Sequence, residues 1–216
     1  MYACRRLGRE GKGDVLMIVL YDYPDCPFSQ KVRVVLAEKD LEFERKLVDL
    51  RRNEQRSAEF LKLNPYGKVP VLVDDDVIVY DSTIINEYLE DEYPNPPLMP
   101  EDSAGRARVR ILEDLADNLF IPRVDIVLAE VHKPEGERDA EKIKKYEGEI
   151  LQLLKRLEPM LGQEYLVGEF SLADVAFIPR VMILGQLGVE LDAGLQQVGA
   201  WIGRLRERPS VRALGL

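Results

Sequence analysis

Histidine and cysteine are scarce in this chain of 216 residues, which contains one histidine and two cysteines. A Cys/His zinc site needs about four such ligands, so we expect no metal site of that type. A catalytic triad built on imidazole would have to use His132, which lies beside Pro134 in a charged stretch typical of a solvated helix end. Cys4 and Cys26 cannot build a disulfide framework, and a free thiol suits a reducing compartment, so a cytoplasmic location is expected.

Long apolar runs and clusters of basic residues are also missing. No run approaches the ~20 consecutive apolar residues of a membrane span, so no membrane association is expected. The chain has a net charge of -9 and lacks a basic tract that could neutralise phosphates, which argues against direct binding of nucleic acid. Residues 1–16 carry cations ahead of a short apolar run, and no cleavage site follows, so we interpret them as an N-terminal tail.

The chain does contain 46% hydrophobic residues, enough for a sizeable core, and its pattern changes near residue 94. Up to that point the periodicity predicts strands at 17–22, 43–49, 69–73 and 77–80, and helices at 29–39, 54–63 and 82–93. A helix between the first two strands implies a parallel crossover, and the acidic turn at 74–76 implies a hairpin. The expected fold class is α/β plus all-α: a mixed four-stranded sheet with helices at 17–93, a proline-rich linker at 94–103 and an all-helical domain at 104–216.

Cys26 is the leading candidate for a reactive residue, because it lies where the first predicted strand gives way to a helix. The unpaired N–H groups at a helix N-terminus stabilise a thiolate, and Pro27 suits the first helical turn. The alternative interpretation is a small residue that merely fits a turn. Tyr23 and Ser29 supply nearby hydroxyls that could activate a thiol substrate, although each is also typical of a packing or capping residue.

Pro70 interrupts a predicted strand, where it cannot donate a hydrogen bond. It therefore marks an edge, a bulge or a cis bond, and a cis bond would leave the backbone of Val69 free to pair with an extended peptide. From the residues alone an edge-strand proline without a ligand is the simpler interpretation.

Two Ser/Asp pairs open predicted helices. Asp81 and Ser82 suit a helix cap, and a helix N-terminus with a free hydroxyl also binds carboxylates. Ser171 and Asp174 have the spacing of a capping box, which we interpret as structural.

Taken together, these residues resemble the glutathione transferase superfamily over nearly the whole chain. The resemblance is carried by Cys26-Pro27-Phe28-Ser29, by Asn64-Pro65 with Val69-Pro70, by Asp81-Ser82, and by the run from Ser171 to Asp174. It implies a thioredoxin-like N-terminal domain, an all-helical C-terminal domain and a homodimer. It also implies a site for the cosubstrate glutathione that includes Phe28, with cis-Pro70 presenting the Val69 backbone to the cysteinyl part. Asp81 and Ser82 would hold the γ-glutamyl end, and Arg56 would contact the glycyl carboxylate.

The run from Cys26 to Gln30 is similar to the omega-class and dehydroascorbate reductase-like members, which use cysteine. This resemblance implies a thiol transferase in which Cys26 forms a mixed disulfide with glutathione, while the partner substrate is an unknown electrophile or disulfide. A second-substrate pocket would lie between residues 109–124 and the end of the chain, where apolar residues such as Leu112 and Phe120 indicate no particular substrate.

A second resemblance is to bacterial stringent starvation protein A, carried by residues 32–39, 87–100 and 169–172. That family keeps the transferase fold, lacks the catalytic cysteine and acts as a regulator bound to RNA polymerase. This chain has Cys26, and it carries Asn95 where that family typically has histidine. The alternative expectation is therefore a non-enzymatic regulator that binds RNA polymerase.

Overall fold

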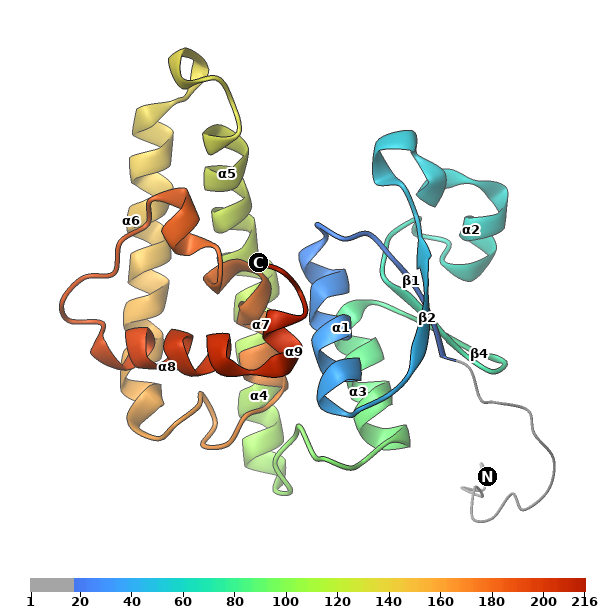
Figure 1. The fold of residues 1–216 in the computed structure, drawn as a ribbon. Helices are drawn as coiled ribbons and strands as arrows, with labels where there is room; N and C mark the ends of the chain where they lie inside the picture. The colour runs from blue at the N-terminus through green and yellow to red at the C-terminus, as the bar shows by residue number, and fades with distance from the viewer. Residues whose placement is uncertain (1–17) are drawn as a thin grey trace.

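The computed structural model describes residues 18–216, and the expected tail at 1–16 lies outside them. Figure 1 shows two parts side by side: a sheet with helices on both faces, and a bundle of helices. This arrangement confirms the predicted fold class. None of the helices within 18–216 has the length and apolar character needed to cross a membrane.

The sheet consists of four short strands in the order β2-β1-β3-β4. Their bounds are β1 Ile18–Asp22, β2 Phe43–Leu47, β3 Val71–Asp74 and β4 Val77–Tyr80. β1 pairs in parallel with β2 and antiparallel with β3, and β3 and β4 form the expected hairpin. The predicted third strand begins later than expected, at Val71, and the Val69–Pro70 peptide bond that precedes it is cis.

Three helices pack on this sheet, with bounds α1 Pro27–Glu38, α2 Ala58–Leu63 and α3 Ser82–Glu92. α1 begins with a proline and buries an apolar face that includes Val32, Val35 and Leu36. Figure 1 shows α1 and α3 between the sheet and the bundle, while α2 lies on the opposite side of the sheet. The N-termini of α1 and α3 therefore lie near the boundary between the two parts.

The proline-rich segment 94–103 is irregular, as its composition predicts, but it is bound to the sheet part by a buried ion pair. The Lys39 ammonium contacts Glu90 at 2.7 Å and donates to the Pro96 carbonyl at 3.0 Å. The Glu90 carboxylate in turn accepts the backbone N–H groups of Leu98 and Met99. These bonds hold the segment against the ends of α1 and α3.

The bundle is entirely helical, which agrees with the periodicity. Its helices are α4 Ser103–Leu115, α5 Ile121–Val131, α6 Ala140–Leu157, α7 Leu172–Val181, α8 Gln196–Glu207 and α9 Pro209–Arg212, and a π-helical turn, Ala116–Phe120, joins α4 to α5. Every residue of α7 is buried, so α7 forms the centre of the bundle. It also packs against α1 and connects the two parts.

Ser171 and Asp174 form the capping box at the start of α7. Asp174 Oδ2 accepts the Ser171 N–H at 3.0 Å. Its other oxygen accepts the Trp201 indole N–H at 2.8 Å and the Leu166 N–H at 3.1 Å. Desolvation by burial raises the pKa of Asp174 to about 6, and these donors counteract that rise. The local cap is therefore also a long-range contact with α8.

Candidate functional site

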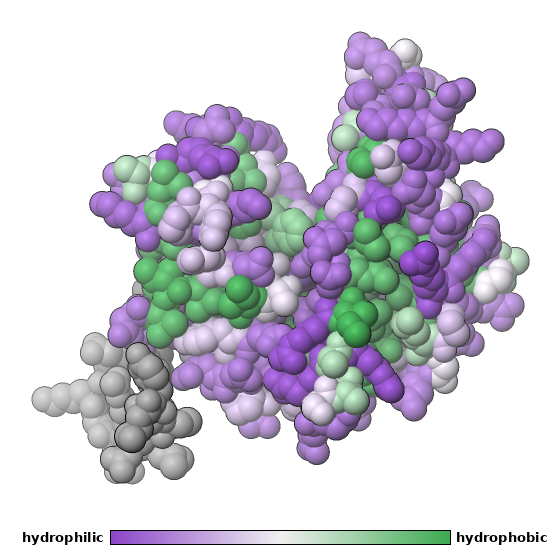
Figure 2. All heavy atoms as spheres, turned by 180° about the vertical axis from the view of Figure 1, so that it is seen from behind, coloured by the Kyte–Doolittle hydropathy of each residue, from purple (hydrophilic) through white to green (hydrophobic). Residues whose placement is uncertain are grey.

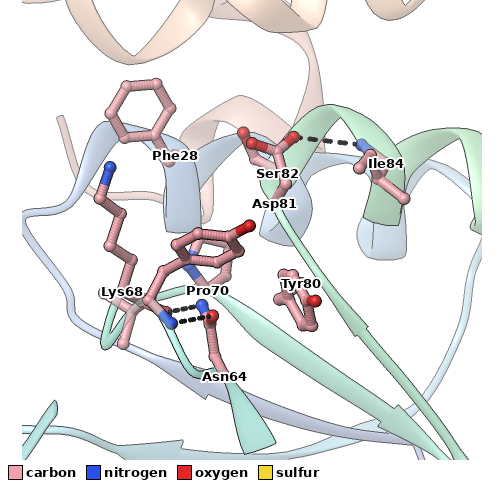
Figure 3. Close-up of a pocket in the computed structure, with 10 residues that line it drawn as sticks. Phe28, Asn64, Lys68, Pro70, Tyr80, Asp81, Ser82 and Ile84 are labelled. Atoms are coloured by element: carbon pink, nitrogen blue, oxygen red, sulfur yellow. Dashed lines mark hydrogen bonds between the residues drawn. The ribbon is translucent and has the colours of Figure 1, made fainter. Parts of the chain in front are cut away.

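A cavity of about 410 Å³ opens beside the end of β4 and the N-terminus of α3 (Figure 3). It falls within the size range of small-molecule sites. Its lining residues are Phe28, Asn64, Tyr66, Lys68, Val69, Pro70, Tyr80, Asp81, Ser82 and Ile84. Five residues expected at a glutathione site thus meet in one cavity, although the chain separates them by more than 50 positions.

Asn64 organises one wall of the cavity. Its side-chain amide donates to the Lys68 carbonyl at 2.7 Å, and its oxygen accepts the Tyr66 N–H at 3.0 Å; both bonds are drawn in Figure 3. Gly67 has a φ of +60°, and a Cβ there would lie 2.9 Å from the Gln55 carbonyl oxygen. Glycine is thus required for this turn to pack against its neighbour.

Val69 follows this turn and presents its backbone at the cavity. No residue within 18–216 forms a hydrogen bond with the N–H or C=O of Val69. Since buried backbone groups are nearly always paired, this pair of groups is available to an extended ligand. The side chain of Val69 is buried and packs with Val48, Phe60 and Val71.

Asp81 and Ser82 form the opposite wall, at the N-terminus of α3. Asp81 has a φ of +75°, a strained conformation for a residue other than glycine. Its carboxylate caps the helix by accepting the N–H groups of Thr83 and Ile84. Ser82 is itself buried, and its N–H and hydroxyl donate to no group in the described part of the chain. This arrangement leaves donors free at a helix N-terminus, where an anion is favoured.

Cys26 is the N-cap residue of α1 and lies next to the cavity rather than among its lining residues. Its N–H donates to the Tyr23 carbonyl at 3.1 Å, and its carbonyl accepts the Gln30 N–H at 3.0 Å. The half-buried side chain packs against the apolar cluster that contains Val69. Cys26 and the cavity are therefore connected through Val69.

The two hydroxyls near Cys26 are engaged within the loop that carries it. Ser29 is fully buried, and its oxygen accepts the Tyr23 N–H at 3.4 Å. The Tyr23 hydroxyl accepts from Arg51 Nε at 2.7 Å. Neither residue lines the cavity.

Arg56 also lies outside the cavity lining, with its side chain against Gly67. The cation that does line the cavity is Lys68, and Figure 3 shows its side chain extending toward Phe28. Sequence reasoning did not place Lys68 at the site, and it quoted Asn64 as part of the Asn64-Pro65 motif without giving it a role in the cavity. The sequence feature that could have placed them at the cavity is their position just before the Val69–Pro70 motif.

Leu112 and Phe120, which we expect along a second-substrate pocket, are largely buried. Both side chains are buried in the core of the bundle, because they lie on the face of α4 and the π-helical turn that packs inward. Leu112 nevertheless borders a separate cavity of about 380 Å³, together with Arg108, Ile111, Met160 and Leu166. A second-substrate pocket along α4 therefore stays a prediction.

Two charged residues, Lys31 and Glu113, are buried near the boundary between the sheet and the bundle, and the Lys31 ammonium lies 5.9 Å from the ring of the cavity residue Phe28. Lys31 of α1 donates to both oxygens of Asp117 at 2.9 Å and lies 3.5 Å from the Thr83 hydroxyl. Glu113, one turn before Asp117, is buried, and neither of its oxygens has a hydrogen-bond partner in the described residues. Desolvation raises the pKa of Glu113 to about 8, so this carboxyl group is protonated at neutral pH. No group of three or more His, Cys, Asp or Glu residues within 18–216 is arranged to hold a metal ion.

Comparison with known proteins places this geometry in a family. Residues 20–97 match the model of the glutathione S-transferase N-terminal domain, and residues 119–209 match that of its C-terminal domain. A relative named stringent starvation protein A homolog, from Pasteurella multocida, is 34% identical over 93% of this chain and 91% of its own length. A probable maleylacetoacetate isomerase from Vibrio cholerae is also 34% identical, over 91% of this chain and 94% of its own length.

Solved structures agree with these matches. A poplar glutathione transferase F1 in which serine 13 is changed to cysteine superimposes with a TM-score of 0.80 at 26% identity, covering 93% of this chain and 97% of that one. A glutathione transferase from Burkholderia graminis, solved with two glutathione molecules bound per subunit, has a TM-score of 0.78 at 27% identity, covering 92% of this chain and 87% of that one. The chain belongs to the glutathione transferase superfamily.

Proposed function

We propose that this protein is a glutathione-dependent thiol transferase that uses Cys26 as its nucleophile. The observation that carries the proposal is the position of Cys26: it caps α1 and packs against the cluster of Val69, whose unpaired backbone faces the cavity. A helix N-terminus favours the thiolate form that attacks a disulfide. Membership of the glutathione transferase superfamily supports glutathione as the ligand.

Glutathione would lie extended across the cavity. The Val69 N–H and C=O would pair with its cysteinyl backbone, as a strand pairs with a sheet edge. The free Ser82 N–H and hydroxyl would bind the γ-glutamyl carboxylate, and the second oxygen of Asp81 would accept its ammonium group. Lys68, or Arg56 after a change of rotamer, would pair with the glycyl carboxylate, and Phe28 and Pro70 would supply apolar contact.

The reaction would proceed through two exchange steps. The Cys26 thiolate attacks the glutathionyl sulfur of a mixed disulfide, so that a new S–S bond forms to Cys26 and the old one breaks. The released thiol leaves as a thiolate and takes a proton from water. A second glutathione thiolate then attacks the Cys26 adduct, which releases oxidised glutathione and restores the Cys26 thiolate.

The test is glutathione-dependent reduction of a small glutathionyl disulfide by the wild type and by Cys26→Ala. We expect Cys26→Ala to abolish turnover and to leave glutathione binding measurable by calorimetry. Mass spectrometry after incubation with oxidised glutathione should find one glutathionyl group on Cys26.

Ser29→Ala and Tyr23→Phe are the matched controls, because both hydroxyls belong to the same loop and neither lines the cavity. Each should retain most of the activity. Turnover that survives Cys26→Ala, or a wild type that neither binds glutathione nor forms the adduct, would overturn the proposal.

We further propose that the protein acts as a cytoplasmic homodimer. Figure 2 shows apolar side chains in patches on both parts of one face. Ile84 on α3 is 57% exposed and Ile111 on α4 is 65% exposed, which is unusual for large apolar side chains. The double substitution Ile84→Glu with Ile111→Glu should halve the mass measured by light scattering. Leu47→Glu, on the edge strand β2 and 61% exposed, should leave the mass unchanged.

The second candidate is a regulator that binds RNA polymerase. Relatives that carry the name stringent starvation protein A homolog, at 31–34% identity, favour it. A tagged full-length protein would then recover polymerase subunits from a bacterial extract, and Cys26→Ala would not reduce that recovery. Recovery together with no glutathione binding would favour the regulator over the enzyme.

A further inference from the structure

One carboxylate and two guanidinium groups meet next to the loop that carries Cys26. Asp22, at the end of β1, is fully buried. Arg45 from β2 donates to Asp22 through Nη2 at 2.9 Å, and Arg33 from α1 lies with Nε 3.3 Å from the same carboxylate. Three elements thus bring two guanidinium groups to one carboxylate.

Asp22 faces two guanidinium groups, but Arg45 is 42% exposed and water screens its charge, whereas Arg33 is only 11% exposed. Charges removed from water are costly unless they are paired. Asp25, the other carboxylate of this loop, lies at its exposed tip and is 3.6 Å from Arg51, which is 79% exposed. Arg33, the buried one of the two arginines, shares Asp22 with Arg45 and therefore lacks a close carboxylate of its own.

Arg33 also connects this group of charges to the loop. Its Nη2 donates to the Pro24 carbonyl at 2.7 Å, two residues before Cys26. Its side chain is only 11% exposed, and its Nε forms no hydrogen bond within the described residues. Desolvation lowers the pKa of Arg33 from its ordinary value, whereas Asp22 and a thiolate at Cys26 favour its charged form. A cation close to a cysteine favours the thiolate form in general.

We propose that Arg33 is a positioning residue for Cys26: it holds the loop through the Pro24 carbonyl and supplies the positive charge that a Cys26 thiolate balances. The consequence for thiol transfer rests on the function proposed above, whereas the charge relationship does not require glutathione. The remaining titratable groups around Cys26 are the hydroxyls of Tyr21, Tyr23 and Tyr80 in its apolar cluster and the exposed pair of Asp25 and Arg51.

The experiment measures the rate of alkylation of Cys26 by iodoacetamide as a function of pH. The full-length chain is used with Cys4→Ser, so that Cys26 is the only thiol. In this background Arg33→Gln should raise the midpoint of the pH profile by about one unit, because a nearby opposite charge shifts a titration by roughly 1–3 units. Arg33→Lys keeps the positive charge, so its midpoint should stay close to that of the parent protein.

Arg51→Gln is the matched control, since Arg51 also binds this loop, through the Tyr23 hydroxyl, but from an exposed position. It should move the midpoint by less than about 0.3 unit, because solvent screens its charge. Asp22→Asn provides a test of opposite sign: it removes the carboxylate that Arg33 and Arg45 share and should lower the midpoint. If Arg33 had a purely structural role, the substitutions Arg33→Gln and Asp22→Asn would move the midpoint of the pH profile in the same direction.

Circular dichroism verifies that each variant is folded. If Arg33→Gln does not fold, the inference is tested by the midpoint of Arg33→Lys and by the direction in which Asp22→Asn moves the midpoint. Equal midpoints for the parent and Arg33→Gln, equal shifts for Arg33→Gln and Arg51→Gln, or an upward shift for Asp22→Asn, would overturn the inference. If Arg33→Gln raises the midpoint but the wild type does not react with glutathione, this inference is supported and the proposed thiol transferase function is refuted.

Discussion

Lys31 of α1 and Asp117 of the π-helical turn form an ion pair across the boundary between the sheet and the bundle, with Lys31 Nζ 2.9 Å from both carboxylate oxygens. The lysine side chain is fully buried. Its neighbours include Thr83, adjacent to Ser82, and Phe28 of the cavity wall, whose ring lies 5.9 Å from the ammonium group. The pair thus connects the packing of the two parts with the shape of the cavity.

Lys31→Met should lower the free energy of unfolding by about 3–5 kcal/mol, because it leaves Asp117 without its partner in a largely buried place. Urea unfolding followed by circular dichroism measures the loss. Arg106→Gln is the matched control, since Arg106 pairs at 3.7 Å with the exposed Asp91 on the same boundary. It should cost less than about 1 kcal/mol, and equal losses would contradict the role given to Lys31.

Glu113→Gln should change the pH dependence of stability. Burial raises the folded-state pKa of Glu113 from its ordinary value of 4.5 to about 8, so the protonated form is favoured by folding. The contribution of protonated Glu113 to the free energy of unfolding is complete below about pH 4.5 and is lost as the pH rises through about 8. The free energy of unfolding of the glutamine variant should therefore match that of the wild type near pH 5 and exceed it near pH 9, by up to about 5 kcal/mol.

Urea unfolding at a series of pH values measures this difference. Glu87→Gln is the control, because a hydrogen bond from Arg110 lowers the pKa of Glu87 and no change of its charge occurs between pH 7 and 9. A wild type whose stability relative to Glu113→Gln is constant from pH 5 to 9 would contradict the prediction.

Asp174→Ala should be among the most destabilising single substitutions, at about 3 kcal/mol or more, because three buried donors lose their acceptor. Trp201→Phe removes one donor and should cost less. A double-mutant cycle between these two positions should give a coupling of about 1–2 kcal/mol. Strict additivity would contradict the contribution of the indole bond.

Lys68→Met should weaken glutathione binding by roughly three- to fivefold, because an ion pair at an exposed lysine contributes up to about 1 kcal/mol. Arg56→Met should have a smaller effect, since Arg56 packs against Gly67 outside the cavity lining. Isothermal calorimetry with glutathione compares the two variants. A larger loss for Arg56→Met would instead support the assignment made from the family resemblance.

Short-range patterns predicted the order of strands and helices well. The continuous apolar run of β1 and the apolar face of α6 are local properties of the chain. The proline at position 70 narrowed the backbone to an edge, a bulge or a cis bond, and the structure has the cis bond. Residues 171–174 predicted a cap because a capping box is complete within four positions.

Long-range partners were not predictable in this way. Lys31 follows the polar pattern of a solvated helix position, and its burial depends on Asp117, 86 residues further along. The indole bond to Asp174 comes from Trp201, 27 residues away. Lys68 was overlooked because a lysine beside a turn is usually solvated, and only the fold places it on a cavity wall.

The ion pair of Lys39 and Glu90 has a practical consequence for dividing the protein. An expressed sheet domain that stopped at Tyr93 would lose the Pro96 carbonyl and the N–H groups of Leu98 and Met99 that satisfy these two buried charges. Such a fragment would expose part of the Lys39 site to water and unfold more easily than the same domain in the full chain. The stable fragment should end after Met99, which means that the proline-rich segment folds together with the sheet and is not a hinge.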